Sequence, residues 1–167
     1  MKARLVSLLC ALTLALTFAI PALAAEVTEA EVPVTLTIIN TERKISVTVP
    51  AALPVSVVDG GVVTATNAAI TNQAESGSIR VTAVAVKPGR YAIGDYENFS
   101  GWGGAIALSV NGCPARGAGA LTLQKDAFPD IAPGRSLAIR YDAKVSVSGK
   151  ADGVTAAMVV FTIEAIN

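Results

Sequence analysis

The sequence predicts an all-β protein, a two-sheet β-sandwich of about eight or nine antiparallel strands. Val, Ile and Thr account for 42 of the 143 residues after residue 24, and β-branched side chains favour strands over helices. Apolar and polar residues alternate with a period of two in several segments, as in strands with one buried face. Turn sequences separate these segments about every 8–12 residues, which is typical of a sandwich. A closed barrel is the alternative architecture.

The first segment has the features of an export signal. Lys2 and Arg4 precede an apolar run over residues 5–20, and small residues follow at Ala22 and Ala24. This is the layout of a secretory signal peptide, and the apolar run is shorter than the roughly 20 residues of a membrane span. We therefore expect residues 1–24 to be cleaved, leaving a secreted, extracellular protein with no membrane span.

The folded domain is expected over residues 32–167, after an acidic and flexible lead-in at residues 25–31. Two alternating segments open the domain, at residues 32–38 and 45–49. In the first of them, one face carries Val32, Val34, Leu36 and Ile38. Each segment predicts a strand with one buried face.

The middle of the chain reads as strands bounded by turns. Asp59-Gly60-Gly61 separates residues 53–58 from residues 62–66, as in a tight hairpin. Further strands are expected at residues 79–87 and 105–110, which end at Pro88-Gly89 and Asn111-Gly112. A helical turn is the alternative for residues 66–76.

Two strands are expected near the C-terminus. Residues 136–148 alternate without interruption, which predicts one long antiparallel strand with a buried face. Residues 154–165 are apolar on both faces, as expected for a strand in the centre of a sheet. Eight or nine such strands favour an immunoglobulin-like sandwich.

Composition excludes several classes of function. The chain has no histidine, which removes Ser-His and Cys-His catalysis and imidazole metal sites. It has 13 basic and 13 acidic side chains and no basic run, so we expect no nucleic-acid partner. Removal of Lys2 and Arg4 with the signal peptide leaves 11 basic and 13 acidic side chains, a net charge of −2. We expect no enzyme activity, no cofactor and no metal.

Carboxylates are the acid-base groups that remain at neutral pH. Asp95 and Glu97 lie close together, and Asp126 and Asp130 form a second pair. Neither pair lies in a recognised catalytic motif, so we interpret them as solvated loop charges. A calcium site at Asp95, Glu97 and Asn98 is the alternative, because Ca²⁺ prefers oxygen ligands.

Aromatic side chains gather in the most glycine-interrupted part of the chain, within twelve residues: Tyr91, Tyr96, Phe99 and Trp102. We interpret Phe99 and Trp102 as core residues that close the end of the sandwich. A carbohydrate-binding site is the alternative, because exposed aromatic rings stack on the flat apolar faces of sugars.

Cys113 is the one cysteine after the signal peptide, because Cys10 leaves with it. We interpret it as an inert, partly buried thiol. An intermolecular disulfide is the alternative, because an odd cysteine in an exported protein suggests one.

Several segments together resemble a known group of proteins. They are Thr48–Val55, Ala65–Asn72, Ile131–Leu137, Tyr141–Val145 and Val159–Ile163. These segments resemble small secreted β-sandwich surface proteins of Gram-positive bacteria (Bacillota), and more distantly the WxL-type cell-surface proteins. The resemblance implies an extracellular surface role without catalysis. The Trp-x-Leu motifs themselves are missing, and no functional residue carries over.

We therefore expect a non-catalytic structural or interaction protein, secreted or held at the cell surface. Its partners are expected to be other extracellular or cell-surface proteins, including copies of itself. The first alternative is a carbohydrate-binding module that binds polysaccharide through the aromatic cluster. The second is a fibre subunit that adds the strand Glu31–Asn40 to a neighbour's sheet, against an ordinary first strand paired within its own domain.

Overall fold

The structure is a computed structural model that describes residues 28–38, 45–101, 103–146 and 153–166. All regular elements in these ranges are strands, numbered β1 to β14, which confirms the predicted all-β class. The expected signal peptide and Trp102 lie outside the described residues. The described ranges contain no helix that is long and apolar enough to cross a membrane.

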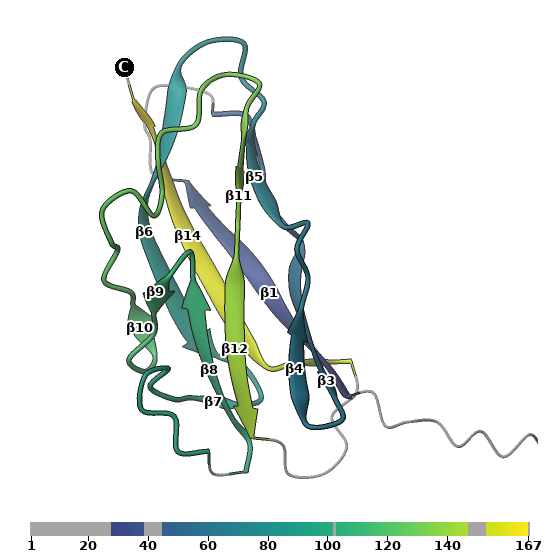
Figure 1. The fold of residues 1–167 in the computed structure, drawn as a ribbon. Coiled ribbons are helices and arrows are strands. Elements are labelled where there is room, and N and C mark those ends of the chain that lie inside the picture. The colour runs from purple at the N-terminus through teal and green to yellow at the C-terminus, as the bar shows by residue number, and fades with distance from the viewer. Residues whose placement is uncertain (1–27, 39–44, 102, 147–152, 167) are drawn as a thin grey trace, which may run out of the picture.

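The largest sheet has seven strands and contains both the first and the last strand (Figure 1). Six of its strands lie side by side in the order β10 (Gly119–Ala120), β6 (Ser78–Pro88), β14 (Ala157–Ile166), β1 (Thr28–Ile38), β3 (Ala52–Val58) and β4 (Gly61–Thr64). The seventh strand, β13 (Val154–Thr155), pairs with β1 outside this order.

Two smaller sheets complete the fold. One has the order β11 (Ser136–Ala138), β5 (Ala69–Asn72) and β2 (Val47–Thr48). The other has the order β12 (Tyr141–Ser146), β8 (Ala105–Val110) and β7 (Ala92–Ile93), with β9 (Cys113–Pro114) paired to β8. In Figure 1, β8 and β12 lie in front of the large sheet. The sheets stay separate, so the closed-barrel alternative is wrong.

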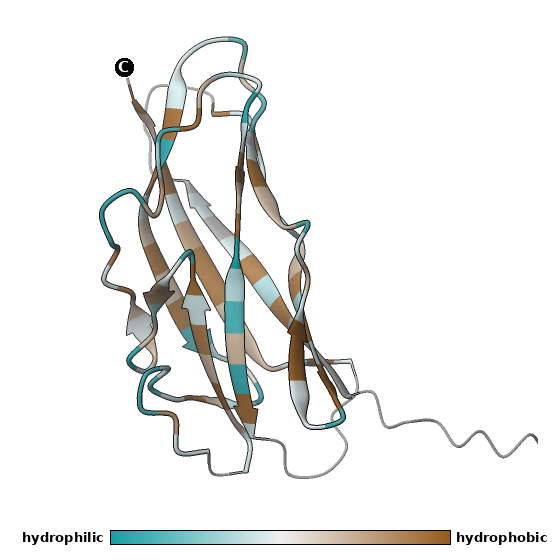
Figure 2. Ribbon diagram, viewed as in Figure 1, coloured by the Kyte–Doolittle hydropathy of each residue, from teal (hydrophilic) through white to brown (hydrophobic). Residues whose placement is uncertain are grey.

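One hydrophobic core fills the space between these layers. Apolar residues (brown in Figure 2) recur along the strands of the large sheet and along β8. The largest side chains that are completely buried are Phe161, Leu53, Ile70, Ile79, Ile106, Leu108, Ile139, Ile163, Val32, Val55, Val84 and Val86. They come from the large sheet, from β5, from β8 and from the segment between β11 and β12, so burial of apolar surface holds these parts together.

A tyrosine hydroxyl also joins the layers. Tyr141 in β12 donates a hydrogen bond of 2.6 Å to the carbonyl of Pro54 in β3. The same hydroxyl accepts one of 3.0 Å from the backbone N–H of Ala65, just after β4. Strands of two different sheets therefore share one side-chain group.

The predicted long strand at residues 136–148 is divided between two sheets. Residues 136–138 pair with β5, whereas residues 141–146 pair with β8. Between them, the N–H of Ile139 bonds to Ala68 and the N–H of Arg140 bonds to the side chain of Asn111. The prediction of one continuous strand is therefore wrong, although its alternating burial persists across the crossing.

Strand β14 lies in the centre of its sheet, between β6 and β1, as the two-sided apolar pattern predicts. Val159, Phe161 and Ile163 are fully buried on one face. Met158 and Val160 are half-buried on the other face. The prediction of a central strand is confirmed.

The strand count and the pairing directions differ from the prediction. The described ranges contain fourteen strands, because short pairings such as β2 and β9 add to six strands of six or more residues. Two of the three sheets are mixed, since β1 runs parallel to β13 and β14, and β7 runs parallel to β8. The expectation of wholly antiparallel strands is wrong for these three pairs.

The ends of two predicted segments also shift. Strand β1 begins at Thr28, so part of the expected lead-in at residues 25–31 belongs to it. Residues 66–76 contain β5 and bends, so the helical-turn alternative is wrong.

Candidate functional site

The β3–β4 hairpin carries the most exposed large apolar side chains of the described residues. Val62 is 36% exposed and Val63 is 55% exposed. Both lie in β4, an edge strand of the large sheet. Their partners across the hairpin are Val57 for Val62 and Ser56 for Val63. We call Val57, Val58, Val62 and Val63 the hairpin valines.

The turn of this hairpin matches its sequence. Asp59 has φ 51° and Gly60 has φ 77°, and Val58 pairs with Gly61 across them. Positive φ at both central residues is the geometry of a type I′ turn, which Asp-Gly favours because it suits the twist of the flanking strands. The hairpin valines are thus held by a well-defined local structure.

The chain on either side of the hairpin is poor in charge, although β1 places Glu29 and Glu31 opposite Ser56 and Pro54 of β3. From Ile45 to Ala74 the sequence contains a single charged residue, Asp59 at the turn. Tyr141 covers the far end of β4 through its bond to Ala65, whereas Val62 and Val63 lie nearer the turn. Sequence reasoning found the turn but missed this surface, and the charge-free run around Val62 and Val63 is the signal that could have found it.

The predicted aromatic cluster is partly built into the protein interior. Tyr91 is 5% exposed and belongs to the core. The ring of Phe99 packs against Gly94, where a Cβ atom would come within 3.0 Å of it. Trp102 lies outside the described residues.

Tyr96 is the remaining member of that cluster, and Lys144 covers its ring. The ammonium nitrogen of Lys144 lies 4.6 Å from the ring centroid and also donates a hydrogen bond of 2.7 Å to the Tyr96 carbonyl. Burial raises the pKa of the Tyr96 phenol, and the charge of Asp142 adds to this. Sugar binding by the cluster stays a prediction, in which Lys144 would share the ring face with a ligand.

The loop carboxylates near the cluster are already hydrogen-bonded. Asp95 accepts bonds from the backbone N–H groups of Glu97 and Asn98 and from the Asn98 side chain. The backbone and side-chain bonds from Asn98 lower the pKa of Asp95. Glu97 pairs with Arg116 at 3.1 Å. Among the residues that the structure describes, no three acidic or cysteine side chains are grouped as metal ligands.

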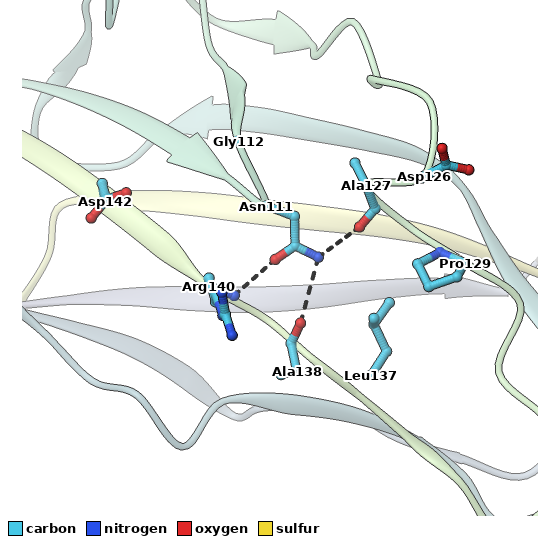
Figure 3. Close-up of a pocket in the computed structure, with 9 residues that line it drawn as sticks. All are labelled: Asn111, Gly112, Asp126, Ala127, Pro129, Leu137, Ala138, Arg140 and Asp142. Carbon is cyan, nitrogen blue, oxygen red and sulfur yellow. Dashed lines mark hydrogen bonds between the residues drawn. The ribbon is translucent and has the colours of Figure 1, made fainter.

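An open pocket of about 520 Å³ lies where the β8–β9 turn meets the β11–β12 crossing (Figure 3). The charged groups of its wall are Arg140, Asp126 and Asp142. The remaining lining residues are Asn111, Gly112, Ala127, Pro129, Leu137 and Ala138.

Asn111 holds this pocket together. Its side-chain amide donates to the carbonyls of Ala127 and Ala138 and accepts from the N–H of Arg140 (Figure 3). The pocket therefore has a hydrogen-bonded wall, and its Arg and Asp side chains could bind a polar ligand. No pair of its side chains forms a nucleophile and base.

Cys113 is completely buried in β9. Its sulfur accepts a hydrogen bond of 3.2 Å from the N–H of Gln124. An intermolecular disulfide through this thiol stays a prediction, and it would require the β8–β9 hairpin to open first.

Comparison with protein-family models, with curated proteins and with solved structures finds no match. The function proposed below therefore rests on the sequence and on the geometry just described.

Proposed function

We propose that the chain is an exported, immunoglobulin-like two-sheet β-sandwich that acts without catalysis, as a structural or interaction protein at the cell surface or in the extracellular space. The observation that carries this proposal is the pair of exposed valines on the β3–β4 hairpin. Val62 and Val63 are consecutive residues of β4, so their side chains lie on opposite faces of the hairpin. Each is exposed apolar surface that contact with another macromolecule would bury.

Three features of the hairpin support a protein as its partner. Val62 and Val63 have aliphatic side chains, and burying them against another apolar surface lowers the free energy of the complex. The hairpin itself contributes only Asp59 to the charge of an interface, and Glu29 and Glu31 lie opposite β3 on its other side, so the desolvation cost of charged groups is low at the β4 edge. The type I′ turn fixes the hairpin, so little conformational entropy is lost on binding.

The test compares two lysine variants for binding to the surface of the cells that make the protein. Val63→Lys places a charge on the hairpin, and Thr122→Lys places the same charge on another exposed position. We expect Val63→Lys to weaken surface binding by about tenfold or more, equivalent to about 1.4 kcal/mol, and Thr122→Lys to leave it unchanged. Circular dichroism and thermal melting confirm that both variants are folded.

Equal binding of the wild-type protein and both variants would overturn the proposal. Hydrolytic activity that a single Asp or Glu substitution abolishes would replace it with an enzyme function.

A further inference from the structure

We infer that the place of β1 in the large sheet, between β3 and β14, is a site for strand exchange. We call this place the seat of β1, and in the exchanged form β1 of a second copy of this chain occupies it. This inference rests on the proposed function, because it names the partner of one protein contact. It assigns the strand that is exchanged, the groove that receives it and the register in which it pairs.

The seat has two different walls. Residues 28–33 of β1 pair antiparallel with β3, and residues 34–38 pair parallel with β14. Residues 30 and 31 also pair with β13. Every residue of β1 therefore has a backbone partner in one of these three strands.

Strand β1 alone connects the two halves of the large sheet. In the sheet order it stands between β14 and β3, and these two strands do not pair with each other (Figure 1). Without β1, both would present unpaired backbone groups, and the core around Val32, which is fully buried, would open to water. An empty seat is thus unstable and readily binds another strand.

The chemistry of β1 suits transfer between copies. Strand β1 carries Glu29 and Glu31 in the half that pairs with β3 and no charged residue from Val32 to Ile38, so the half that pairs with β14 desolvates no charge. Val32 is buried in the core, and Val34 packs against it. An identical strand from another copy makes the same contacts, which is why swapping an element between copies costs little.

The position of β1 in the chain favours exchange on kinetic grounds. Val34 and Val159 are neighbours in the sheet although 125 positions separate them in the sequence. Pairings between segments so distant in sequence form slowly, so the β14 side of the seat stays open longer than the β3 side, where Pro33 and Ala52 are 19 positions apart. Strand β1 is also the first of the described strands. It can leave the seat while the other described strands keep their pairing with one another.

The test traps β1 with cysteines at a paired position. Thr37 and Thr162 are direct neighbours in the parallel register, and Thr37 is exposed while Thr162 is half-buried. The variant Thr37→Cys/Thr162→Cys, purified from its own cells without denaturation and oxidised, is run on a non-reducing gel. We expect products of two or more chains, because the two cysteines that meet belong to different copies.

Two kinds of control make this result specific, and a second in-register pair replaces the first if needed. Each single variant reports any cross-link that passes through Cys113. Thr35→Cys/Thr162→Cys places the cysteines two positions out of register and should cross-link at least tenfold more slowly. If the first double variant does not fold, Thr35→Cys/Val160→Cys tests the same seat, because Thr35 pairs with Val160.

A disulfide that forms only within single chains, at every protein concentration, would overturn the inference. That result would leave the proposed function in place, because binding through Val63 is measured separately and Val63 lies in β4, which pairs with β3 and not with β1. Conversely, cross-linked copies with no dependence of surface binding on Val63 would support exchange and overturn the role of the hairpin.

Discussion

At the scale of single residues, the Tyr141 hydroxyl joins β12 to β3 through the Pro54 carbonyl and the Ala65 N–H. We expect Tyr141→Phe to lower the free energy of unfolding by about 1–3 kcal/mol, because a carbonyl and an N–H lose their partner. Urea unfolding measures this loss. Tyr96→Phe is the control, since Tyr96 contacts Lys144 through its ring and backbone carbonyl, which Phe keeps. Equal losses in both variants would contradict the role of the hydroxyl.

Asn72 is a second single-residue determinant of stability. Its buried amide donates to the carbonyls of Gly77 and Ile131 and accepts from the N–H of Ala74. We expect Asn72→Ala to cost about 2–4 kcal/mol, because it removes three hydrogen bonds at a fully buried position. Chemical unfolding of Gln73→Ala, an exposed neighbour, should show a change below about 1 kcal/mol. An Asn72→Ala variant whose free energy of unfolding falls as little as that of Gln73→Ala would contradict this role and would indicate that water replaces the amide.

At the scale of elements, the β3–β4 hairpin depends on the left-handed backbone of its turn. Gly60 has φ 77° with open space around its Cα, whereas a Cβ atom on Gly61 would lie 3.4 Å from the Val58 carbonyl oxygen, an ordinary contact. We expect Gly60→Ala to destabilise the protein by about 1 kcal/mol through backbone strain alone. Gly61→Ala is the matched control and should have a smaller effect in thermal unfolding. The reverse order would mean that the turn is not type I′.

The same hairpin shows what the sequence could and could not predict. Asp59-Gly60 specifies its own turn through local backbone energetics, so the hairpin was predictable. Exposure of Val62 and Val63 was not, because it depends on where the neighbouring layer ends. The crossing after Ala138 was also hidden, since alternation continues while the chain changes sheets.

The pairing of β1 illustrates a further limit. Its period-two pattern predicts a strand with a buried face, and the buried Val32 agrees with that. The pattern contains no information on which strands lie beside it, because registers between distant segments arise from packing of the whole core. The position of β1 between β3 and β14 therefore could not be derived from the sequence.

At the scale of the whole molecule, two carboxyl groups make stability depend on pH. The bond from Arg80 lowers the pKa of Asp130, and the bonds from Asn98 lower the pKa of Asp95. A carboxyl whose pKa is lower in the folded than in the unfolded chain stabilises the fold above the ordinary value of 3.8. This contribution is lost as the pH falls through the lowered value.

We therefore expect the melting temperature to change little from neutral pH down to about pH 5 and to fall below about pH 4. Thermal melts across this range measure the effect. Asp130→Asn removes one of the two groups and should make the acid-induced decrease shallower, whereas Asp126→Asn, at an exposed loop position, serves as the control. An unchanged slope in Asp130→Asn would contradict the contribution of the Arg80 pair.

The parallel pairing of β1 with β14 has a mechanical consequence. Both strands run in the same direction over the pairs from Val34–Val159 to Ile38–Ile163, so the start of β1 and the end of β14 lie at opposite ends of the molecule (Figure 1). A pull applied between those two points slides one strand along the other, and the hydrogen bonds between them share the load instead of breaking one by one. A protein stretched between two attachments at a cell surface would resist tension through this one pair of strands.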